Sequence, residues 1–296
     1  VHVVVTMNEC NIAAVLKDYV QQLIAKGEKG AIERIADKRW KKAAAERCGT
    51  TEDMFCSFPG AADAQGEATV MAAHRAARDV IRRVAPHVKV GFSLSLQQSQ
   101  ARPGGEQRAL DSWQQKFRQW LPLMADDDFV ATQTYTRSLV AADGSYDTPA
   151  GSRSTQMNFE YAPEALAAVL RTIASEIDKP ILITENGAAV DDDRERVEFI
   201  GRALAGVHQC LAEGVKVMGY FYWSSFDNFE WYFGYAKRFG LIAVDRETME
   251  RIPKESAFYL GNIARTNQLP PEAQVQPQPD SGRDLLDFLK SPGKAA

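Results

Sequence analysis

The sequence predicts an α/β fold built on a parallel β-sheet. Short apolar stretches alternate with longer segments in which apolar residues recur at helical spacing, an order typical of parallel strands joined by helices. The stretch at residues 181–183 is apolar without alternation and stops at Thr184-Glu185-Asn186-Gly187, as expected of a strand buried on both faces. A barrel of strand–helix units needs about 250 residues, and the chain has 296.

Five strands are expected. The first is rich in β-branched residues, the second alternates between apolar and polar residues, and the third opens with three acidic residues. Helical segments separate them, so we count five strand–helix units. The strands are expected at residues 1–7, 88–96, 126–136, 181–183 and 215–223.

Helices are expected where apolar residues share one face. Pro163 lies in the first turn of one helix and Gly214 ends another, which are favoured positions for these residues. His74 lies in an apolar helical stripe and is interpreted as a core histidine rather than a ligand. The helices are expected at residues 12–23, 31–47, 65–84, 110–124, 163–177, 191–213 and 255–266.

The composition is that of a soluble globular protein, with 45% hydrophobic and 25% charged residues. A formal net charge of -4 argues against nucleic acid and against an anionic membrane surface as partners. No apolar run approaches the roughly 20 residues of a membrane span, and no basic-then-apolar signal segment opens the chain. We therefore expect no membrane partner.

The cysteines and histidines are scattered, and none has the spacing of a metal site. We therefore expect neither a metal nor another cofactor. Free thiols in a protein of this size favour a reducing compartment, hence a cytoplasmic location, although a Cys48–Cys56 disulfide stays open. The residues concerned are Cys10, Cys48, Cys56 and Cys210, with His2, His74, His87 and His208.

Two carboxylates directly follow predicted strands. Glu185 comes after the strand at 181–183, and Glu9 comes after the strand at 1–7. The carboxyl ends of parallel strands meet on one face of a barrel, where such folds place their chemistry, so both residues are candidates for working groups in a pocket. The alternative for Glu185 is a purely structural hydrogen-bond acceptor.

Three motifs follow one another along the chain: TMNE at residues 6–9, ITENG at residues 183–187, and YFYWSSFDNFEWYFGYAKRFGLIAVD at residues 220–245. Together they resemble the family 1 glycoside hydrolases of the retaining β-glucosidase type. The first is similar to the family's T-x-N-E-P motif, the second to its nucleophile motif, and the third to its C-terminal signature. The third is the most specific, and the resemblance extends over about residues 1–266.

The resemblance implies a TIM (β/α)8 barrel in which the N-E-P motif closes the fourth strand. The chain would then carry units 4–8 and lack units 1–3, which agrees with the count of five units. We expect an incomplete barrel as a catalytic domain at residues 1–267. The Pro/Gln-rich residues 268–296 are expected to form a mobile tail, in which residues 284–290 can form one short amphipathic helix.

By the same resemblance, Glu185 is the nucleophile and Glu9 the general acid/base. Retaining hydrolysis uses two carboxyls about 5–5.5 Å apart: one attacks while ionised, and the other donates a proton and later activates water. Two acids that face one pocket push their pKa values apart, which supplies this division of labour. The implied activity is hydrolysis of β-glycosidic bonds by a two-glutamate double displacement.

Further residues match positions that bind sugar in the family. The resemblance implies that Asn8 binds the 2-hydroxyl and that Tyr135 donates a hydrogen bond to the nucleophile. Trp223 matches the platform under the sugar ring, where an aromatic face covers apolar C–H groups. The alternative for Trp223 is core packing.

Glu230 and Trp231 match the pair that binds the far hydroxyls of the glycone, and Phe239 is expected as a contact at the rim. The carboxylate of Glu230 would repel a phosphate group. The expected partner is therefore a small unphosphorylated β-glycoside or oligosaccharide, with glucosides or related sugars as substrates.

The chain departs from the family pattern at two places. Cys10 stands where the motif has proline, so the turn that holds Glu9 should be less rigid. Gln133 and Thr134 replace the usual Asn-Tyr before Tyr135. The side chain of Gln133 either reaches further into the pocket or repacks.

Two hypotheses of different classes follow. The first is an active β-glycosidase. The second is a catalytically incompetent barrel fragment that serves as an assembly partner or as a weak sugar-binding module. An open barrel leaves strand edges unpaired and apolar faces uncovered, so a homo-oligomer or a second chain would complete it.

Overall fold

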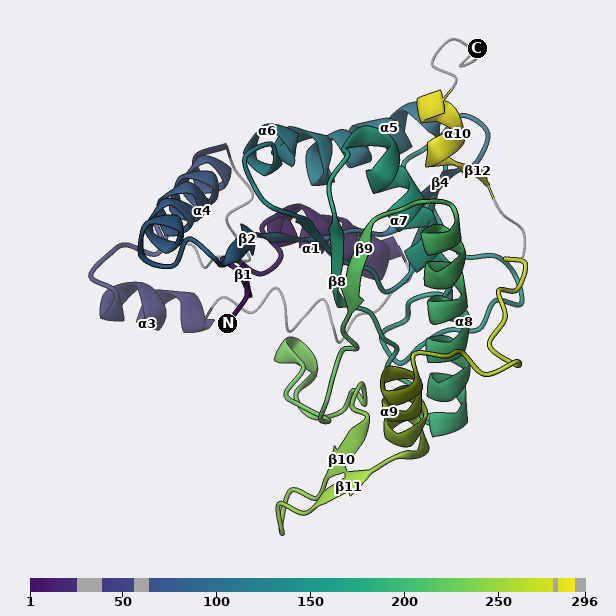
Figure 1. Ribbon diagram of the computed structural model, residues 1–296. Helices are drawn as coiled ribbons and strands as arrows, with labels where there is room; N and C mark the ends of the chain where they lie inside the picture. Colours follow the sequence, from purple (N-terminus) through teal and green to yellow (C-terminus); the bar gives the residue numbers. More distant parts are fainter. Residues whose placement is uncertain (26–38, 56–63, 279–281, 291–296) are drawn as a thin grey trace.

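A parallel sheet with helices packed around it forms the centre of the molecule (Figure 1). The structure is a computed structural model that describes residues 1–25, 39–55, 64–278 and 282–290. Strand β8 lies between β5 and β9. The strands of this sheet are β1 (Val3–Val5), β2 (Lys89–Gly91), β3 (Ser93–Ser95), β5 (Val130–Gln133), β8 (Ile181–Glu185) and β9 (Val217–Tyr220).

The strands pair in parallel from β1 to β9. β1 pairs with β2, β3 with β5, β5 with β8, and β8 with β9. Only Phe92 separates β2 from β3, so these two labels mark one pass of the chain through the sheet. The five strands predicted from the sequence are confirmed at the expected places.

The pairing of β5 with β8 contains one irregularity. Thr132 faces Ile183, but the register then shifts and Gln133 faces Glu185, so that Thr184 is skipped. A shift of this kind bends the strand locally and re-aims side chains. It places Gln133 across the ladder from the candidate nucleophile.

Apolar side chains are buried on both faces of the sheet. The larger cluster packs against the helices and includes the fully buried Phe117, Trp120 and Phe199. The smaller cluster lies on the other face and is formed by Phe129 and Leu182 with the neighbouring residues Val3, Val5, Ala131 and Met218. Both clusters hold the carboxyl ends of the strands in place.

The sheet is open at both edges in the described part of the chain. There β1 and β9 each pair with one neighbouring strand, and both strands are only half-buried. Directly after β9, the side chain of Phe221 is 58% exposed. The sheet therefore keeps two edges with unpaired backbone groups, which favours association with another strand.

The helices agree with the sequence prediction with one exception. The helix expected at residues 110–124 is interrupted, because α5 ends at Lys116 and a 3-10 turn precedes α6, which has Pro122 in its first turn. Proline has no N–H to donate and disfavours a helical residue before it. The helices are α1 (Ile12–Ala25), α3 (Arg39–Arg47), α4 (Ala64–Val84), α5 (Glu106–Lys116), α6 (Leu121–Met124), α7 (Ala165–Glu176), α8 (Asp193–Ala212), α9 (Glu255–Thr266) and α10 (Leu285–Lys290). Residues 31–38 of the helix expected at 31–47 lie outside the described residues.

The C-terminal segment, where it is described, packs on the body of the molecule, so the expectation of a mobile tail is wrong there. β12 (Arg283–Asp284) pairs with β4 (Gln98–Ala101) in a second sheet, which also contains β6 (Arg137–Val140) and β7 (Tyr146–Asp147). Helix α10 follows and buries Leu285 and Phe288 (upper right in Figure 1). Leu285 and Phe288 lie three positions apart and give this short helix an apolar face to dock, so the short amphipathic helix expected at residues 284–290 is confirmed.

A hairpin of β10 (Ile242–Val244) and β11 (Arg251–Pro253) projects from the body (bottom of Figure 1). Cys10, Cys48 and Cys210 carry free thiols, and Cys56 lies outside the described residues. Within the described ranges, no helix is long and apolar enough to cross a membrane.

Candidate active site

Polar side chains from several strands gather at the carboxyl end of the sheet. Asn8 and Glu9 follow β1, Gln133 ends β5, Glu185 ends β8, and Trp223 follows β9. The strands are parallel, so their carboxyl ends lie on one side of the sheet. The structure brings the two candidate carboxylates close enough for the charge of Glu9 to act on Glu185.

Both carboxylate oxygens of Glu185 accept hydrogen bonds. The hydroxyl of Tyr135 donates to Oε2 in a short contact, and the Nε2 amide of Gln133 donates to Oε1 at 2.9 Å. Burial raises the pKa of Glu185 to about 7, while the two donors act in the opposite direction. Hydrogen bonds to the charged form favour ionisation, so this carboxyl combines a buried position with direct support for its negative charge.

Glu9 is held through its backbone and its side chain. Its backbone N–H donates to the hydroxyl of Ser93 at 3.0 Å, and the next N–H, that of Cys10, donates to the carbonyl of Ser93 at 3.0 Å. Burial raises the pKa of Glu9 to about 7, and a hydrogen bond from Ser95 lowers it in part. Ser93 thus supports the turn in which Cys10 replaces the motif's proline.

The pKa values of both carboxyls are shifted in the same direction. Burial is the largest cause for both, and each value is raised to about 7. The charge of Glu9 raises the pKa of Glu185 further, so ionisation of one carboxyl opposes ionisation of the other. The hydrogen bonds from Tyr135 and Gln133 lower the pKa of Glu185 and so favour its charged form.

Asn8 lies beside the two carboxyls with its side chain exposed. Its Oδ1 accepts a hydrogen bond from Nε2 of Gln133 at 2.6 Å and a longer one from the hydroxyl of Ser93 at 3.4 Å. Both contacts engage the carbonyl end of the side-chain amide. The Nδ2 end is therefore the part of Asn8 that can donate to a substrate.

Trp223 is half-buried in an aromatic cluster with Tyr135 and Phe239. Phe239 is only 4% exposed, and its ring packs edge-on against that of Tyr135 at 6.0 Å between centroids. The ring of Phe239 is therefore buried against Tyr135 and is not exposed at a rim, and its contact with substrate stays a prediction. A sequence motif gives residue types, and the solvent exposure of a side chain does not follow from it.

Glu230 and Trp231 lie next to this cluster. Burial raises the pKa of Glu230, and a hydrogen bond from the side chain of Trp223 opposes that shift. The charge of Glu230 raises the pKa of both Glu9 and Glu185, so the three carboxyls share one site. Trp231, in contrast, is 75% exposed.

Known proteins are similar to this chain in sequence and in structure. The model of glycosyl hydrolase family 1 matches residues 123–269. Beta-glucosidase A of Thermotoga maritima is 36% identical over 159 residues, which are 48% of this chain and 35% of that protein. The crystal structure of a beta-glycosidase aligns with 95% of this chain and 65% of its own, at 36% identity and a TM-score of 0.79. The chain belongs to glycosyl hydrolase family 1.

The chain corresponds to part of a family 1 enzyme. It spans 35% and 40% of the length of two curated relatives, the second being a 1,4-beta-D-glucan glucohydrolase of Thermotoga neapolitana that is 33% identical over 180 residues, 51% of this chain. The family 1 beta-glucosidase structure from Thermotoga maritima aligns with 68% of this chain and 56% of its own, at 27% identity and a TM-score of 0.62. The five parallel strands are therefore part of an incomplete (β/α)8 barrel.

Some residues of this candidate site were not fully predictable from the sequence. Of the two alternatives for Gln133, the structure favours the one in which its side chain reaches into the pocket, because it contacts both Asn8 and Glu185. Ser93 and Ser95, which support Glu9, were not singled out. The sequence does contain an indication of both serines. They are the polar residues near the carboxyl end of the alternating strand at 88–96, and the carboxyl ends of barrel strands form the site in such folds.

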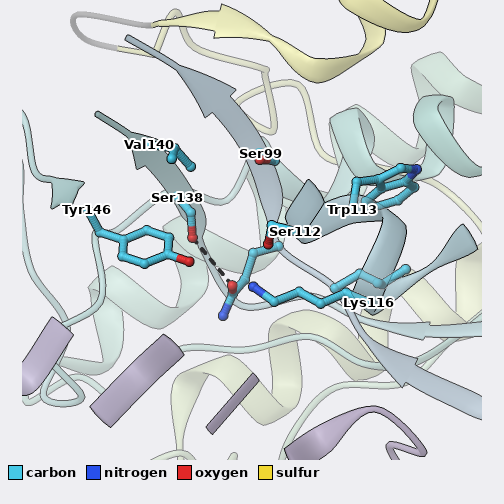
Figure 2. Close-up of a pocket in the computed structure, with 9 residues that line it drawn as sticks. Ser99, Ser112, Trp113, Lys116, Ser138, Val140 and Tyr146 are labelled. Carbon is cyan, nitrogen blue, oxygen red and sulfur yellow. Dashed lines mark hydrogen bonds between the residues drawn. The ribbon is translucent and has the colours of Figure 1, made fainter. Parts of the chain in front are cut away.

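A small pocket away from the two candidate carboxylates lies between β4, β6 and α5. Figure 2 shows Lys116, Tyr146 and Ser138 around it, with Ser138 hydrogen-bonded to Gln97. Lys116 is paired with Asp18, and the hydroxyl of Tyr146 also donates to Asp18, at 2.6 Å. The cavity volume is about 10 Å³, room for about one water molecule, so this pocket is too small for a sugar. Among the described residues, no group of three His, Cys, Asp or Glu side chains is placed to hold a metal ion.

Proposed function

We propose that this site hydrolyses β-glycosidic bonds with retention of configuration, and that its substrates are small unphosphorylated β-glucosides or related glycosides. The observation that carries the proposal is that Glu9 and Glu185 both lie at the carboxyl end of the parallel strands, close enough to interact electrostatically. Glu185 also accepts hydrogen bonds from two side chains. The relatives named beta-glucosidase A and 1,4-beta-D-glucan glucohydrolase support the reaction class.

In this proposal Glu185 is the nucleophile. Its ionised carboxylate attacks the anomeric carbon, the glycosidic bond breaks, and a covalent glycosyl–enzyme forms. Tyr135 and Gln133 stabilise the negative charge before the attack. They also orient the carboxylate. Its Oε1 accepts a hydrogen bond from Gln133 at the end of β5, and its Oε2 accepts one from Tyr135, two residues further along the chain.

Glu9 is the general acid/base. A carboxyl with a pKa of about 7 keeps a proton near neutral pH and donates it to the departing oxygen. When Glu185 becomes part of the covalent intermediate, its negative charge disappears. The pKa of Glu9 then falls, so Glu9 is ionised in time to accept a proton from the attacking water.

The remaining residues bind the glycone. Asn8 donates to the sugar 2-hydroxyl, a contact that strengthens in the transition state. Trp223 lies under the apolar face of the ring, and Glu230 with Trp231 binds the distant hydroxyls. The carboxylate of Glu230 disfavours a phosphorylated sugar at this position.

A second candidate function is that of an incomplete barrel that does not turn over, acting as an assembly partner or a weak sugar-binding module. The exposure of Trp231 and the open edges of β1 and β9 within the described residues favour it. In this case a second copy or a different chain would pair with the edges and complete the site.

Release of nitrophenol from an aryl β-glucoside tests the proposal. We expect the chain to be active and Glu185→Gln to lose about 10³-fold or more in rate, with an unchanged circular dichroism spectrum. The exposed Glu247→Gln is the matched control and should keep full activity. Equal rates for the chain and for Glu185→Gln would contradict the nucleophile assignment, and no release from any folded variant would favour the second candidate.

A further inference from the structure

The amide of Gln133 connects two groups of the site. The side chain is fully buried, and its Nε2 lies 2.6 Å from Oδ1 of Asn8, 2.9 Å from Oε1 of Glu185 and 3.3 Å from the hydroxyl of Ser93. The register shift between β5 and β8 places Gln133 directly across from Glu185. One side chain thus contacts both the candidate nucleophile and the residue proposed to bind the 2-hydroxyl.

Hydrogen-bond chemistry determines how these groups are oriented. An ionised carboxylate only accepts hydrogen bonds, so Gln133 must present its N–H group to Glu185. The same nitrogen faces Asn8, and Asn8 must therefore present its carbonyl oxygen. Its Nδ2 group is then turned away from Gln133 and remains the donor of that side chain.

A second contact supports this orientation of Asn8. The hydroxyl of Ser93 also donates to Oδ1 of Asn8, at 3.4 Å. Within the described residues, Nδ2 of Asn8 has no hydrogen-bond partner, and the side chain is exposed. Asn8 therefore presents an unpaired donor next to Glu185.

The buried amide of Gln133 is engaged through its nitrogen alone. In the described part of the structure, its Oε1 has no hydrogen-bond partner. Buried acceptors without partners are uncommon and are tolerated mainly where function requires the arrangement. Packing alone therefore does not explain why an amide occupies this position.

Building on the proposed function, we propose that Gln133 is a positioning residue that turns the Asn8 amide into a donor for the sugar 2-hydroxyl while it holds the Glu185 carboxylate. Preference for glycosides that carry a 2-hydroxyl then depends on Gln133, although Gln133 itself does not contact the sugar. Without this amide, Asn8 is free to rotate, and Tyr135 is the side-chain donor to Glu185 that remains among the described residues.

The test compares Gln133→Met and Gln133→Asn with the unaltered chain. Methionine has a similar volume without the amide, and asparagine is a shorter amide that tests conservative rescue. Thr134→Val is the matched control, because Thr134 is equally buried and its hydroxyl has no hydrogen-bond partner among the described residues. Two measurements are made on each variant: the titration midpoint of the Glu185 carboxyl by ¹³C NMR, assigned with Glu185→Gln, and kcat/KM for aryl β-glucosides with and without a 2-hydroxyl.

Gln133→Met should raise the titration midpoint of Glu185, because a donor to the charged form is lost. It should also reduce the preference for the 2-hydroxyl substrate about tenfold. Gln133→Asn should restore part of both effects, and Thr134→Val should change neither. A merely structural residue would change the melting temperature without changing the midpoint or the substrate preference.

The NMR titration requires no turnover, so it judges the inference even if the chain does not hydrolyse glucosides. An unchanged midpoint in Gln133→Met would overturn the contact with Glu185. In an active chain, an unchanged 2-hydroxyl preference would overturn the orientation of Asn8. A chain that is inactive but shows the raised midpoint would refute the proposed function of the isolated chain and keep the role of Gln133 as a support of Glu185.

Discussion

Glu9 occupies a backbone conformation that few residues adopt. Its φ is +46°, a left-handed conformation that costs a non-glycine residue about 1–2 kcal/mol. Ser93 offsets this cost with two acceptors, its hydroxyl for the N–H of Glu9 and its carbonyl for the N–H of Cys10. The strained geometry lies at the proposed acid/base, where such strain commonly serves function.

Tyr135 leads to the first prediction. Its hydroxyl lowers the pKa of Glu185, so Tyr135→Phe should raise that pKa above about 7 and move the acidic limb of the kcat/KM profile to higher pH. At pH 6 we expect kcat/KM to fall about 10- to 100-fold, the value of one hydrogen bond to a charged group. A pH–rate profile measures both effects.

Tyr161→Phe is the control for this experiment. Its hydroxyl donates to the carbonyl of Glu195 at 2.6 Å, outside the site, so the substitution removes the same atom without touching Glu185. An acidic limb that shifts equally in both variants would show that Tyr135 acts only through the fold.

The raised pKa values of Glu9 and Glu185 predict how stability depends on pH. Each value rises from 4.5 to about 7 on folding. Below pH 4.5 both carboxyls are protonated in the folded and the unfolded chain. Between pH 4.5 and 7 the unfolded chain ionises first, so the free energy of unfolding should fall as pH rises.

Glu185→Gln should remove part of this loss. The variant should exceed the unaltered chain in unfolding free energy by about 1–3 kcal/mol at pH 8 and match it at pH 4. Urea unfolding at the two pH values measures the difference. A gain of the same size at both pH values would mean that the effect comes from packing and not from charge.

Site residues were predictable from the sequence where their position after a strand was enough to identify them, and not where their contacts decide their role. Glu9 and Glu185 were identified because a carboxylate directly after an apolar strand has a definite place in a parallel fold. The burial of Phe239 and the contacts of Gln133 depend on neighbours far along the chain, such as Asn8. A single sequence does not record those neighbours.

At the scale of elements, strand positions were predictable and strand registers were not. The apolar runs located all five passes of the sheet. The shift between Thr132 and Gln133 arises only when β5 meets β8, since register depends on the pairing of two strands and not on either strand alone. That shift is the reason why Gln133 reaches Glu185.

A buried polar network ties α4 to the sheet. His74 lies with Nδ1 2.6 Å from the hydroxyl of Thr6 and Nε2 3.0 Å from Asp127. Arg78, one turn further along α4, donates to Asp127 at 2.9 Å. The prediction that His74 is a core residue is confirmed by its full burial, and the network fixes the end of β1 just before Asn8 and Glu9.

The docking of helix α10 should contribute to the stability of the chain. Phe288 is buried against Ala101, Ala109 and Val140, so Phe288→Ala should destabilise the chain by about 3–5 kcal/mol. The exposed Lys290→Ala on the same helix should cost less than about 0.5 kcal/mol. Urea unfolding measures both. Equal stabilities would mean that residues 285–290 do not take part in the cooperative fold.

At the scale of the whole molecule, the fold class followed from the alternation of strands and helices, and the incompleteness followed from the count of units. The structure agrees with both, since five parallel passes form the sheet and the aligned beta-glycosidase extends well beyond this chain. The way the C-terminal segment docks was not predictable, because its few apolar residues acquire meaning only against the second sheet.

The open edge at β9 leads to the last prediction. Among the described residues, no further strand pairs with this edge, and Phe221 is 58% exposed directly after the strand. An unpaired edge beside an exposed aromatic side chain favours association. We expect the purified chain to associate with rising concentration in sedimentation experiments. Phe221→Lys should weaken that association about tenfold or more, because a lysine beside an edge disfavours docking of another strand.

Met249→Lys is the matched control, since Met249 is 51% exposed in the connection between β10 and β11. This hairpin projects away from the central sheet (Figure 1). An equal effect of both substitutions would indicate general stickiness instead of a specific edge. A chain that stays monomeric at every concentration and melts cooperatively would show that β9 needs no partner. Association that depends on Phe221, together with glucosidase activity that rises with the associated fraction, would mean that another chain completes the barrel at this edge and that Glu9 and Glu185 work only in the completed site.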